Sequence, residues 1–307
     1  MSASGNPILF RSGFAALVGR PNVGKSTLFN ALLGEKLAIV TDKPQTTRNR
    51  IRGILNLPDA QAVFLDTPGI HKPQHRMNEI MVKNAVSTLG EVDVVCLLVE
   101  ATQPPGVGDR FIIDLMKRVG TPAFLVINKI DLVRRETLLP FIDEARTLHP
   151  FAEVIPVSAV TGENLEDLKE TIVRALPEGP RLFPEDMKTD QTERFLASEL
   201  IREQVFLQTK EEVPYSTAVV VEEMKDRPDG TIYIRALVVV ERESQKGIVI
   251  GRKGARLKAI GQAARHEVER ILGAKAYLDL FVKVKARWRE EAEILRDFGY
   301  TIEDGER

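Results

Sequence analysis

Cysteine is almost absent from this sequence, because Cys96 is the single one among 307 residues. An intramolecular disulfide is therefore excluded, and its place in the apolar run VDVVCLLV predicts a small buried side chain. A chain without disulfides is typical of the cytosol. Histidines are few and scattered, without further ligands at the spacing of a zinc site, so we expect no zinc.

Long hydrophobic runs and a leader are also missing. No stretch approaches the roughly 18 consecutive apolar residues that span a bilayer. The start, MSASGNPILFRSG, has no apolar core behind basic residues, so we expect no signal peptide and a cytoplasmic protein. Net charge is nearly absent too, since 43 basic and 44 acidic residues sum to −1. Any functional charge must therefore come from an uneven distribution along the chain.

The length predicts two domains rather than one. The first part alternates continuous apolar runs with amphipathic helical stretches, and such runs are typical of strands covered on both faces. This order predicts an α/β domain with a mostly parallel, doubly wound sheet over residues 1–178. The expected strands are 14–18, 61–65, 92–100, 122–128 and 153–158, and the expected helices are 77–89, 108–118, 136–147 and 164–175.

The second part follows a linker at 179–190, where prolines and a glycine break regular structure. Residues 191–307 change order and predict a small α+β domain. A helix at 192–209 precedes two strands, 215–224 and 231–241, joined by the turn sequence KDRPDG. The later elements expected are a helix at 255–272, a strand at 276–286 and a terminal helix at 287–300.

The segment GRPNVGKS matches the phosphate-loop pattern G-x-x-x-x-G-K-[ST], after a strand and at the start of a helix. Its glycines allow backbone N–H groups to face phosphate oxygens, and the helix N-terminus adds a favourable dipole. Lys25 is expected to reach the β and γ phosphates, and Ser26 to bind Mg²⁺. The predicted nucleotide contacts here are Gly19, Arg20, Pro21, Asn22, Val23, Gly24, Lys25, Ser26 and Thr27.

Two further motifs stand at strand ends. In DTPG, Asp66 is expected to hold Mg²⁺ through water and Gly69 to donate its N–H to the γ phosphate. In NKID, Asp131 can accept two hydrogen bonds from guanine, which adenine does not offer, so GTP is favoured over ATP. The predicted contacts from these motifs, with a Ser-Ala pair after the next strand, are Asp66, Thr67, Pro68, Gly69, Asn128, Lys129, Asp131, Ser158 and Ala159.

These motifs in this order resemble the GTPase family of phosphate-loop proteins over residues 14–175. The resemblance implies that DKPQTTRNR (42–50) is a mobile switch with a magnesium-binding threonine. Thr46 and Thr47 are both candidates and we favour Thr47, while a polar loop with a helix cap is the alternative. The implied catalytic residues are Lys25, Thr47 and Gly69, and the implied metal ligands are Ser26, Thr47 and Asp66.

One position departs from the Ras-like pattern. Ile70 follows DTPG, where Ras-like GTPases carry a glutamine that orients the attacking water. Isoleucine cannot hydrogen-bond water, so we expect slow intrinsic hydrolysis that a partner raises. Asn22 resembles the asparagine that binds K⁺ in some bacterial GTPases, so K⁺ is a candidate cofactor beside Mg²⁺.

The second part contains a basic glycine motif between two helical segments, which matches the G-x-x-G loop of a KH module. Residues 246–289 hold 12 Lys and Arg against three acids, a local charge of +9, which is typical of a nucleic-acid surface. A solvated basic face and a surface for acidic lipid are the alternatives. We expected Lys283, Lys285 and Arg287 to share one strand face. The predicted RNA contacts are Gly251, Arg252, Lys253, Gly254, Arg256, Lys258 and Lys283.

Taken end to end, the chain resembles the Era family of bacterial GTPases, within the TrmE-Era-EngA-YihA-Septin-like superfamily. The resemblance implies a switch that binds small-subunit ribosomal RNA near its 3′ end and assists assembly of the small ribosomal subunit. It also implies loose peripheral association with the inner face of the cell membrane, and a monomer is the default. GTP is then expected to set the switch, reposition the KH domain and change RNA affinity.

Three other readings predict different behaviour. A GTPase acting through a protein or membrane partner would lack RNA affinity. A structural assembly factor would keep its cellular role when Lys25 is substituted. A phosphate-loop ATPase would bind ATP as well as GTP, which the NKID sequence argues against.

Overall fold

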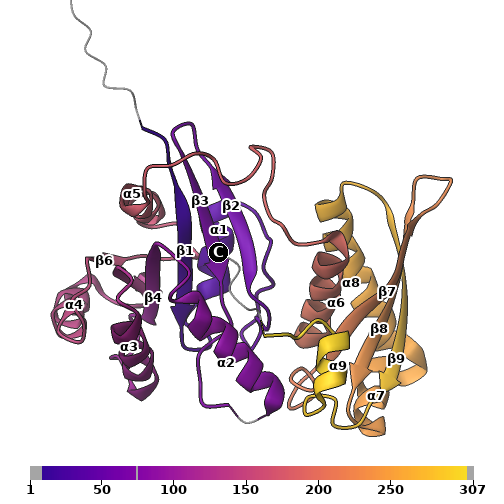
Figure 1. The fold of residues 1–307 in the computed structure, drawn as a ribbon. Coiled ribbons are helices and arrows are strands. Elements are labelled where there is room, and N and C mark those ends of the chain that lie inside the picture. The colour runs from indigo at the N-terminus through magenta and orange to yellow at the C-terminus, as the bar shows by residue number, and fades with distance from the viewer. Residues whose placement is uncertain (1–8, 74, 303–307) are drawn as a thin grey trace, which may run out of the picture.

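The computed structural model describes residues 9–73 and 75–302 of the 307. Two sheets lie side by side, each with its own helices, and a long connection joins them (Figure 1). The first eight residues, on which part of the signal-peptide expectation rests, lie outside the described ranges. The same holds for the outermost residues of both predicted domains, and the division at 178 and 191 stays a prediction.

The first sheet has six strands in the order β2-β3-β1-β4-β5-β6. All neighbours pair in parallel except β2 with β3, which are antiparallel. This confirms the α/β class with a mostly parallel sheet. The strands are β1 (Arg11–Gly19), β2 (Ile51–Asn56), β3 (Ala60–Asp66), β4 (Val94–Glu100), β5 (Ala123–Asn128) and β6 (Glu153–Pro156).

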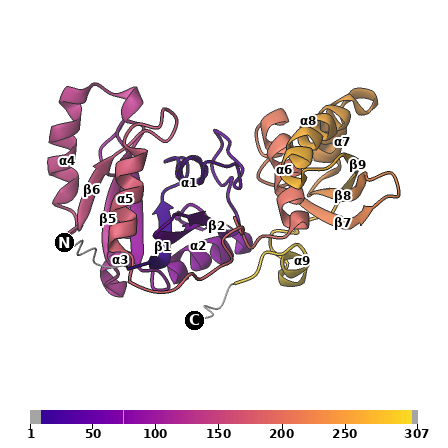
Figure 2. The same cartoon turned by 90° about the horizontal axis from the view of Figure 1, so that it is seen from above.

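Helices cover both faces of this sheet (Figure 2). One core lies under α1 (Lys25–Leu33) and α5 (Leu165–Ala175), and it contains Cys96. The other core lies under α2 (Arg76–Thr88), α3 (Val107–Val119) and α4 (Leu138–Arg146). Short 3-10 turns at Ile130–Leu132 and Arg135–Thr137 lead into α4. Because the parallel strands β1, β3, β4, β5 and β6 all end at one edge, the motifs that follow them meet there.

Strand β2 is not among the strands that the sequence predicts. It forms a hairpin with β3 through the turn that follows Asn56, and Leu57 N donates to Ala60 O at 2.8 Å. Its pattern is interrupted by Gly53, where a Cβ would lie 2.3 Å from the Leu33 side chain and 2.6 Å from that of Phe29. Because α1 packs closely against this position, glycine stands where an apolar residue would have indicated a strand.

The connection between α5 and α6 (Glu193–Gln208) is bound to the first sheet rather than free. The backbone N–H groups of Leu182 and Phe183 donate to the buried Gln61 side chain at 2.7 and 2.9 Å. Farther on, Ile54 N donates to Lys188 O at 2.8 Å. These contacts fix the point from which the second half of the chain departs.

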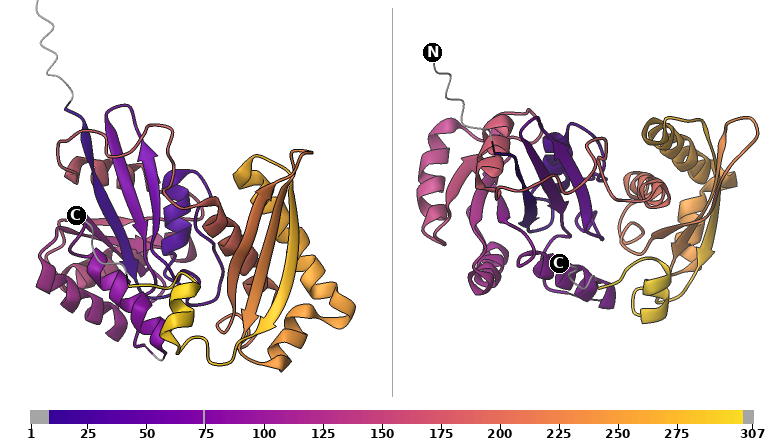
Figure 3. Two further views of the ribbon diagram at one scale, coloured as in Figure 1. Left: turned by 45° about the vertical axis from the view of Figure 1, so that its right-hand side comes forward. Right: turned by 45° about the horizontal axis from the view of Figure 1, so that its top comes forward.

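The second sheet has the order β7-β8-β9, with an antiparallel first pair and a parallel second pair. Helices α6 and α8 pack on one face, and the predicted order of helix, strand, strand, helix, helix, strand is confirmed. The elements are α6 (Glu193–Gln208), β7 (Ala218–Asp226), β8 (Ile232–Val240), α7 (Glu243–Ile250), a 3-10 turn (Arg252–Gly254), α8 (Ala255–Leu272) and β9 (Ala276–Val284). Helix α6 faces the first half of the molecule (Figure 3).

The predicted terminal helix over 287–300 is wrong in extent, because α9 covers only Ala292–Asp297. Trp288 explains the difference. It is fully buried beside Ile294, Leu295 and Tyr300, and its indole N–H donates to Ser216 O at 2.9 Å. Burying this large side chain takes the backbone out of helical geometry before α9 begins. Within the described residues, no helix is both long and apolar enough to cross a bilayer.

Candidate functional site

The phosphate loop lies between β1 and α1 and has a strained backbone. Asn22 and Gly24 adopt left-handed conformations, with φ of 66° and 97°. A Cβ on Gly24 would lie 2.3 Å from Asn128 Nδ2, so only glycine fits there. Lys25 is 6% exposed, and its ammonium donates to the carbonyl oxygens of Gly19 at 3.2 Å and Arg20 at 2.9 Å. The loop therefore holds a buried cation at the N-terminus of α1.

The three predicted metal ligands meet at the end of this loop. Ser26 Oγ lies 2.7 Å from Thr47 Oγ1 and donates to Asp66 Oδ2 at 2.7 Å, and Thr47 Oγ1 donates to the same oxygen at 3.1 Å. The other carboxylate oxygen, Asp66 Oδ1, is buried without a hydrogen-bond partner among the described residues. A hard cation with a preference for oxygen ligands, such as Mg²⁺, fits this donor set. Thr47 therefore takes the position expected of the switch threonine.

Burial destabilises both charges of the site. It lowers the pKa of Lys25 to about 8, against the attraction of Asp66. It raises the pKa of Asp66 to about 6, against the attraction of Lys25 and hydrogen bonds from Ser26 and Thr47. At neutral pH both groups still keep mostly their charged forms, and a ligand of opposite sign would stabilise each charge. The site is therefore suited to a polyanion next to Lys25 and a cation next to Asp66.

A second cluster lies where β5 and β6 end. Asn128 donates to Val23 O at 2.9 Å and accepts from Ala159 N at 3.0 Å, so it joins the phosphate loop to the loop after β6. Ser158 Oγ donates to Asp131 Oδ1 at 2.6 Å, which orients the carboxylate predicted to read guanine. These hydrogen bonds bring the two parts of the predicted base site together.

Lys129 has a left-handed backbone, with φ of 65°, and its ammonium lies 2.6 Å from Glu100 Oε2. It lines the same cavity as the phosphate loop. This cavity measures about 440 Å³, and Gln45 and Asp42 of the switch lie on its wall. Gln45, whose amide lies 3.1 Å from His71 Nε2, was not singled out from the sequence.

Three predicted contacts turn their side chains away from this cavity. Arg20 forms an ion pair with the fully buried Asp109 of α3 at 2.8 Å. Val23 packs in the core under α1, and Thr67 Oγ1 donates to Leu17 O at 2.8 Å. Their contribution to nucleotide binding can therefore come only from the backbone.

The backbone of the DTPG segment lies directly against the phosphate loop. A Cβ on Gly69 would lie 2.8 Å from Pro21 N, so the glycine is required for this close approach. Pro68 is buried at the same edge, and Thr27 lines the cavity from α1. Ile70 is 1% exposed, its N–H donates to Gly19 O at 3.2 Å, and its side chain packs in the core under α2 and α3.

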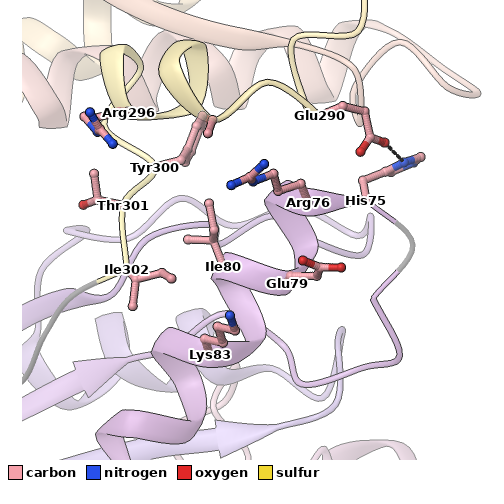
Figure 4. Close-up of a pocket in the computed structure, with 11 residues that line it drawn as sticks. His75, Arg76, Glu79, Ile80, Lys83, Glu290, Arg296, Tyr300, Thr301 and Ile302 are labelled. Carbon is pink, nitrogen blue, oxygen red and sulfur yellow. Dashed lines mark hydrogen bonds and ion pairs between the residues drawn. The ribbon is translucent and has the colours of Figure 1, made fainter.

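A larger cavity of about 700 Å³ lies elsewhere, between α2 and the C-terminal segment (Figure 4). His75 Nδ1 lies 3.0 Å from Glu290 Oε1 at its rim, and its walls mix Arg76, Lys83 and Arg296 with acidic side chains. None of the nucleotide motifs reaches it. We therefore assign the nucleotide site to the smaller cavity and treat the larger one as part of the interface between the two halves.

The basic glycine loop joins α7 to α8. Gly251, Lys253 and Gly254 have left-handed φ values of 72°, 53° and 78°. Arg252 and Lys253 are exposed at its tip. Arg256 instead donates to Ile248 O at 2.6 Å, so it braces the loop against the end of α7. The loop thus presents two exposed cationic side chains from a glycine turn.

The other predicted RNA contacts are not all brought to this loop. Lys258 is exposed on α8, one turn farther along. Lys283 is different, because the alternate residues of β9, among them Leu280 and Val282, pack toward α8 and place Lys283 on the opposite face of the sheet. Lys283 therefore lies apart from the loop residues, and its contact with RNA stays a prediction.

The predicted alternation of three basic residues along this strand also fails. Strand β9 ends at Val284, and Arg287 has a left-handed φ of 52°. Lys285 and Arg287 therefore lie beyond the strand. Burial of Trp288 turns the chain there, which alternation alone does not reveal.

Known families match both halves. Residues 14–129 match the family described as 50S ribosome-binding GTPase, and residues 212–289 match the KH domain family. The second match covers the glycine loop and both flanking helices. The KH module predicted from the sequence is thereby confirmed.

Relatives match nearly the whole chain. The GTPase Era of Geobacter metallireducens is 53% identical over 299 residues, which cover 97% of this chain and all of the relative. That of Syntrophus aciditrophicus is 52% identical over 300 residues, covering 97% of this chain and 98% of the relative.

Solved structures agree over the same span. A variant of Aquifex aeolicus Era bound to GDP and AlF₄⁻ superposes with a TM-score of 0.92 at 45% identity, covering 95% of this chain and 99% of that one. An Era complex with MgGDPNP and nucleotides 1506–1542 of 16S ribosomal RNA matches with the same values. The shared order of motifs, the KH module and identity over nearly full length show that this chain is a GTPase of the Era family.

Proposed function

We propose that this GTPase is a magnesium-dependent switch that binds small-subunit ribosomal RNA near its 3′ end and assists assembly of the small ribosomal subunit. The observation that carries the proposal is the meeting of Ser26, Thr47 and Asp66 within hydrogen-bond distance at the end of the phosphate loop. It is supported by the Era complex that contains MgGDPNP together with 16S ribosomal RNA.

The residues of the site divide the work of hydrolysis. Ser26, Thr47 and Asp66 would hold Mg²⁺, which when bound neutralises charge on the β and γ phosphate oxygens. Lys25 places a positive charge at the same phosphates, and Gly69 offers a backbone N–H to the γ phosphate. Water attacks the γ phosphorus, the bond to the β–γ bridging oxygen breaks, and GDP and inorganic phosphate leave. These residues position charge and take no part in covalent chemistry.

We also propose two details of hydrolysis, which concern the positioning of the attacking water and the role of K⁺. The buried Ile70 offers no hydrogen bond to the attacking water, so intrinsic turnover is slow and a partner or a cation supplies the missing contact. Asn22 is a candidate K⁺ ligand, and its amide already donates to Asp42 O of the switch at 3.1 Å. Replacing K⁺ with Na⁺ in a single-turnover assay tests the cation, because equal rates would remove it from the proposal.

RNA binding is proposed for the loop at Gly251–Gly254. Glycines let an RNA backbone approach, and the exposed Arg252 and Lys253 meet its phosphates. Lys258 extends the same surface along α8. Because these side chains carry charge rather than base-reading groups, the loop contributes affinity and position more than sequence preference.

The deciding experiment measures binding of a single-stranded probe from the 3′ end of 16S ribosomal RNA with a GTP analogue, with GDP and without nucleotide. Charge reversal of the loop, Arg252→Asp with Lys253→Asp, should abolish binding that the GTP analogue promotes. The matched control is Lys117→Asp with Arg118→Asp, an adjacent exposed pair on α3. Equal losses in both variants, or equal weak binding in all nucleotide states, would contradict the proposal.

A membrane partner is the second candidate, and the open face of the second sheet is the observation that favours it. Tyr277 and Phe281 are 52% and 45% exposed there, beside Arg235 and Lys283. Flotation with vesicles of anionic lipid would support peripheral attachment to the inner face of the membrane. We also propose a cytoplasmic location and a monomeric state. Light scattering tests the monomeric state.

A further inference from the structure

The switch segment is attached to the second half of the molecule. Helix α6 is the element of the second half that lies nearest to α1 and the loop after it (Figure 2), and several hydrogen bonds and ion pairs cross the boundary. Val40 N donates to Glu203 Oε1 at 3.0 Å, and the Lys43 ammonium donates to Thr209 O at 2.8 Å. Lys36 joins Glu203 of α6 and Glu267 of α8 at 2.7 and 3.2 Å. Lys36 and Val40, which precede the switch, and Lys43 within it thus all have partners in the second half.

Arg48 is the deepest of these contacts. It is 1% exposed and follows directly after Thr47. Its guanidinium donates to three main-chain oxygens of the second half, at 2.6 Å to Thr217, 3.2 Å to Pro214 and 3.1 Å to Tyr215. A planar donor fork that meets several carbonyls has little freedom to move.

Aromatic rings enclose the same guanidinium. The Arg48 Cζ atom lies 5.6 Å from the ring centroid of Phe206, 5.9 Å from that of Trp288 and 6.0 Å from that of Tyr300. All three rings belong to the second half, and they add cation–π attraction in a buried setting. A residue of the switch is therefore inserted into the core of the other domain.

Arg202 of α6 makes the reciprocal contact. It is 1% exposed, and its Nη2 donates to Thr46 O at 2.6 Å, while its Nε donates to Glu199 at 2.7 Å. Thr47 consequently stands between two residues, Thr46 and Arg48, that are both bound to the second half. Its hydroxyl lies at the Ser26 and Asp66 oxygens.

We infer that Arg48 and Arg202 are positioning residues for GTP hydrolysis, so that the KH half holds Thr47 at the magnesium site. The inference deepens the proposed role of Thr47 and rests on it. Neither arginine reaches the nucleotide cavity, so each acts only through the backbone on one side of Thr47. GDP binding, which relies on the phosphate loop and the base site, should not need them.

The test compares Arg48→Lys and Arg202→Lys with the unmodified full chain. Each variant keeps a cation and loses the donor fork. We expect kcat to fall about 10-fold or more, because small displacements of a positioned group carry that cost. The Mg²⁺ concentration for half-maximal hydrolysis should rise, and GDP affinity should stay unchanged. Arg118→Lys is the matched control, because it makes the same exchange at an exposed arginine of α3, outside the switch.

The outcomes separate the inference from its premise. An unchanged kcat and Mg²⁺ midpoint in both arginine variants would overturn it. Parallel losses of GDP affinity and of thermal stability in both would also overturn it, since they indicate a merely structural role. Arg202→Lys keeps the test decisive if Arg48→Lys fails to fold. Thr47→Ala measured alongside tests the premise, because an unchanged Mg²⁺ requirement there contradicts the proposed magnesium role itself.

Discussion

The phosphate loop and the loop at Gly251–Gly254 are both glycine turns that open a helix, yet they hold their basic side chains differently. Lys25 is buried and bonded to carbonyl oxygens of its own loop. Arg252 and Lys253 are exposed and extend from the surface. The first loop has its cation fixed by hydrogen bonds before a ligand arrives, whereas the exposed cations of the second would lose side-chain freedom on binding.

This difference follows from the ligands that each loop is built for. A compact nucleotide requires a small number of contacts in fixed places, so burial and hydrogen bonding are favourable there. A flexible RNA backbone offers many equivalent phosphates, and exposed charges can follow it. Nucleotide affinity should therefore depend on the local order of the phosphate loop, and RNA affinity should depend on ionic strength.

The largest expected effect comes from removing the fixed cation. Lys25→Ala should reduce GTP hydrolysis by about 100-fold or more, because charge preorganised at the phosphates is lost from a buried site. Single-turnover kinetics measure it, and Lys117→Ala on exposed α3 is the control. Hydrolysis within a few-fold of the unmodified protein would contradict the comparison between the two loops.

The second largest effect is expected from salt, which should weaken RNA binding far more than GDP binding. RNA affinity should decline linearly on a logarithmic salt scale, and Arg252→Ala should reduce that slope by about 0.7, the contribution of one phosphate contact on a single strand. GDP affinity should change far less over the same range, because Lys25 is buried. Fluorescence anisotropy titrations at several KCl concentrations measure both, and similar slopes for RNA and GDP would refute the distinction.

Within the basic loop, the two glycines should differ. A Cβ on Gly251 would lie 2.8 Å from Arg256 Cβ at a φ of 72°, whereas Gly254, at 78°, has nothing within 4 Å. Gly254→Ala should cost about 1 kcal/mol of unfolding free energy for the left-handed backbone, and Gly251→Ala about 2–3 kcal/mol because a clash is added. Urea unfolding measures the difference, and an equal cost would remove the steric argument.

The smallest effect is expected at the exposed contact between the halves. The hydrogen bond from His75 lowers the pKa of Glu290 below its usual 4.5. A carboxyl whose pKa is lowered on folding stabilises the folded state at any pH above its pKa in the unfolded chain. This contribution disappears as the pH falls through its pKa in the folded protein. His75→Ala should therefore cost under about 1 kcal/mol at neutral pH, and the cost should vanish in acid. A cost that persists once the Glu290 carboxyl is protonated would contradict this sign.

Local sequence patterns were sufficient to predict the nucleotide motifs but not every secondary-structure element. GRPNVGKS, DTPG and NKID could be placed from the sequence because each depends on its own backbone and on the strand before it. Strand β2 could not be predicted, because glycine at position 53 lets α1 pack closely and interrupts the apolar pattern of the strand. The terminal helix was overextended for a similar reason, since burial of Trp288 overrides local propensity.

The candidate RNA residues show the same limit. Gly251–Gly254 were identified by spacing, and Arg256 also lies at the loop, although it braces rather than projects. Lys283 was grouped with them by charge and by its expected alternation with Lys285 and Arg287, yet the sheet, covered by α8 on one side, places it on the opposite face. Composition counts charges along the chain without showing which surface carries them.

The sequence by itself determined the family, the order of elements and the residue types of the nucleotide site, because short-range geometry at strand ends dictates them. Tertiary structure alone decided that the switch is anchored outside its own domain. Arg48 is one arginine in a polar loop as far as the sequence shows, and the carbonyls and rings that bury it lie about 160 to 250 residues farther along the chain. Such contacts arise only when two separately folded surfaces meet, since no local pattern records the partner.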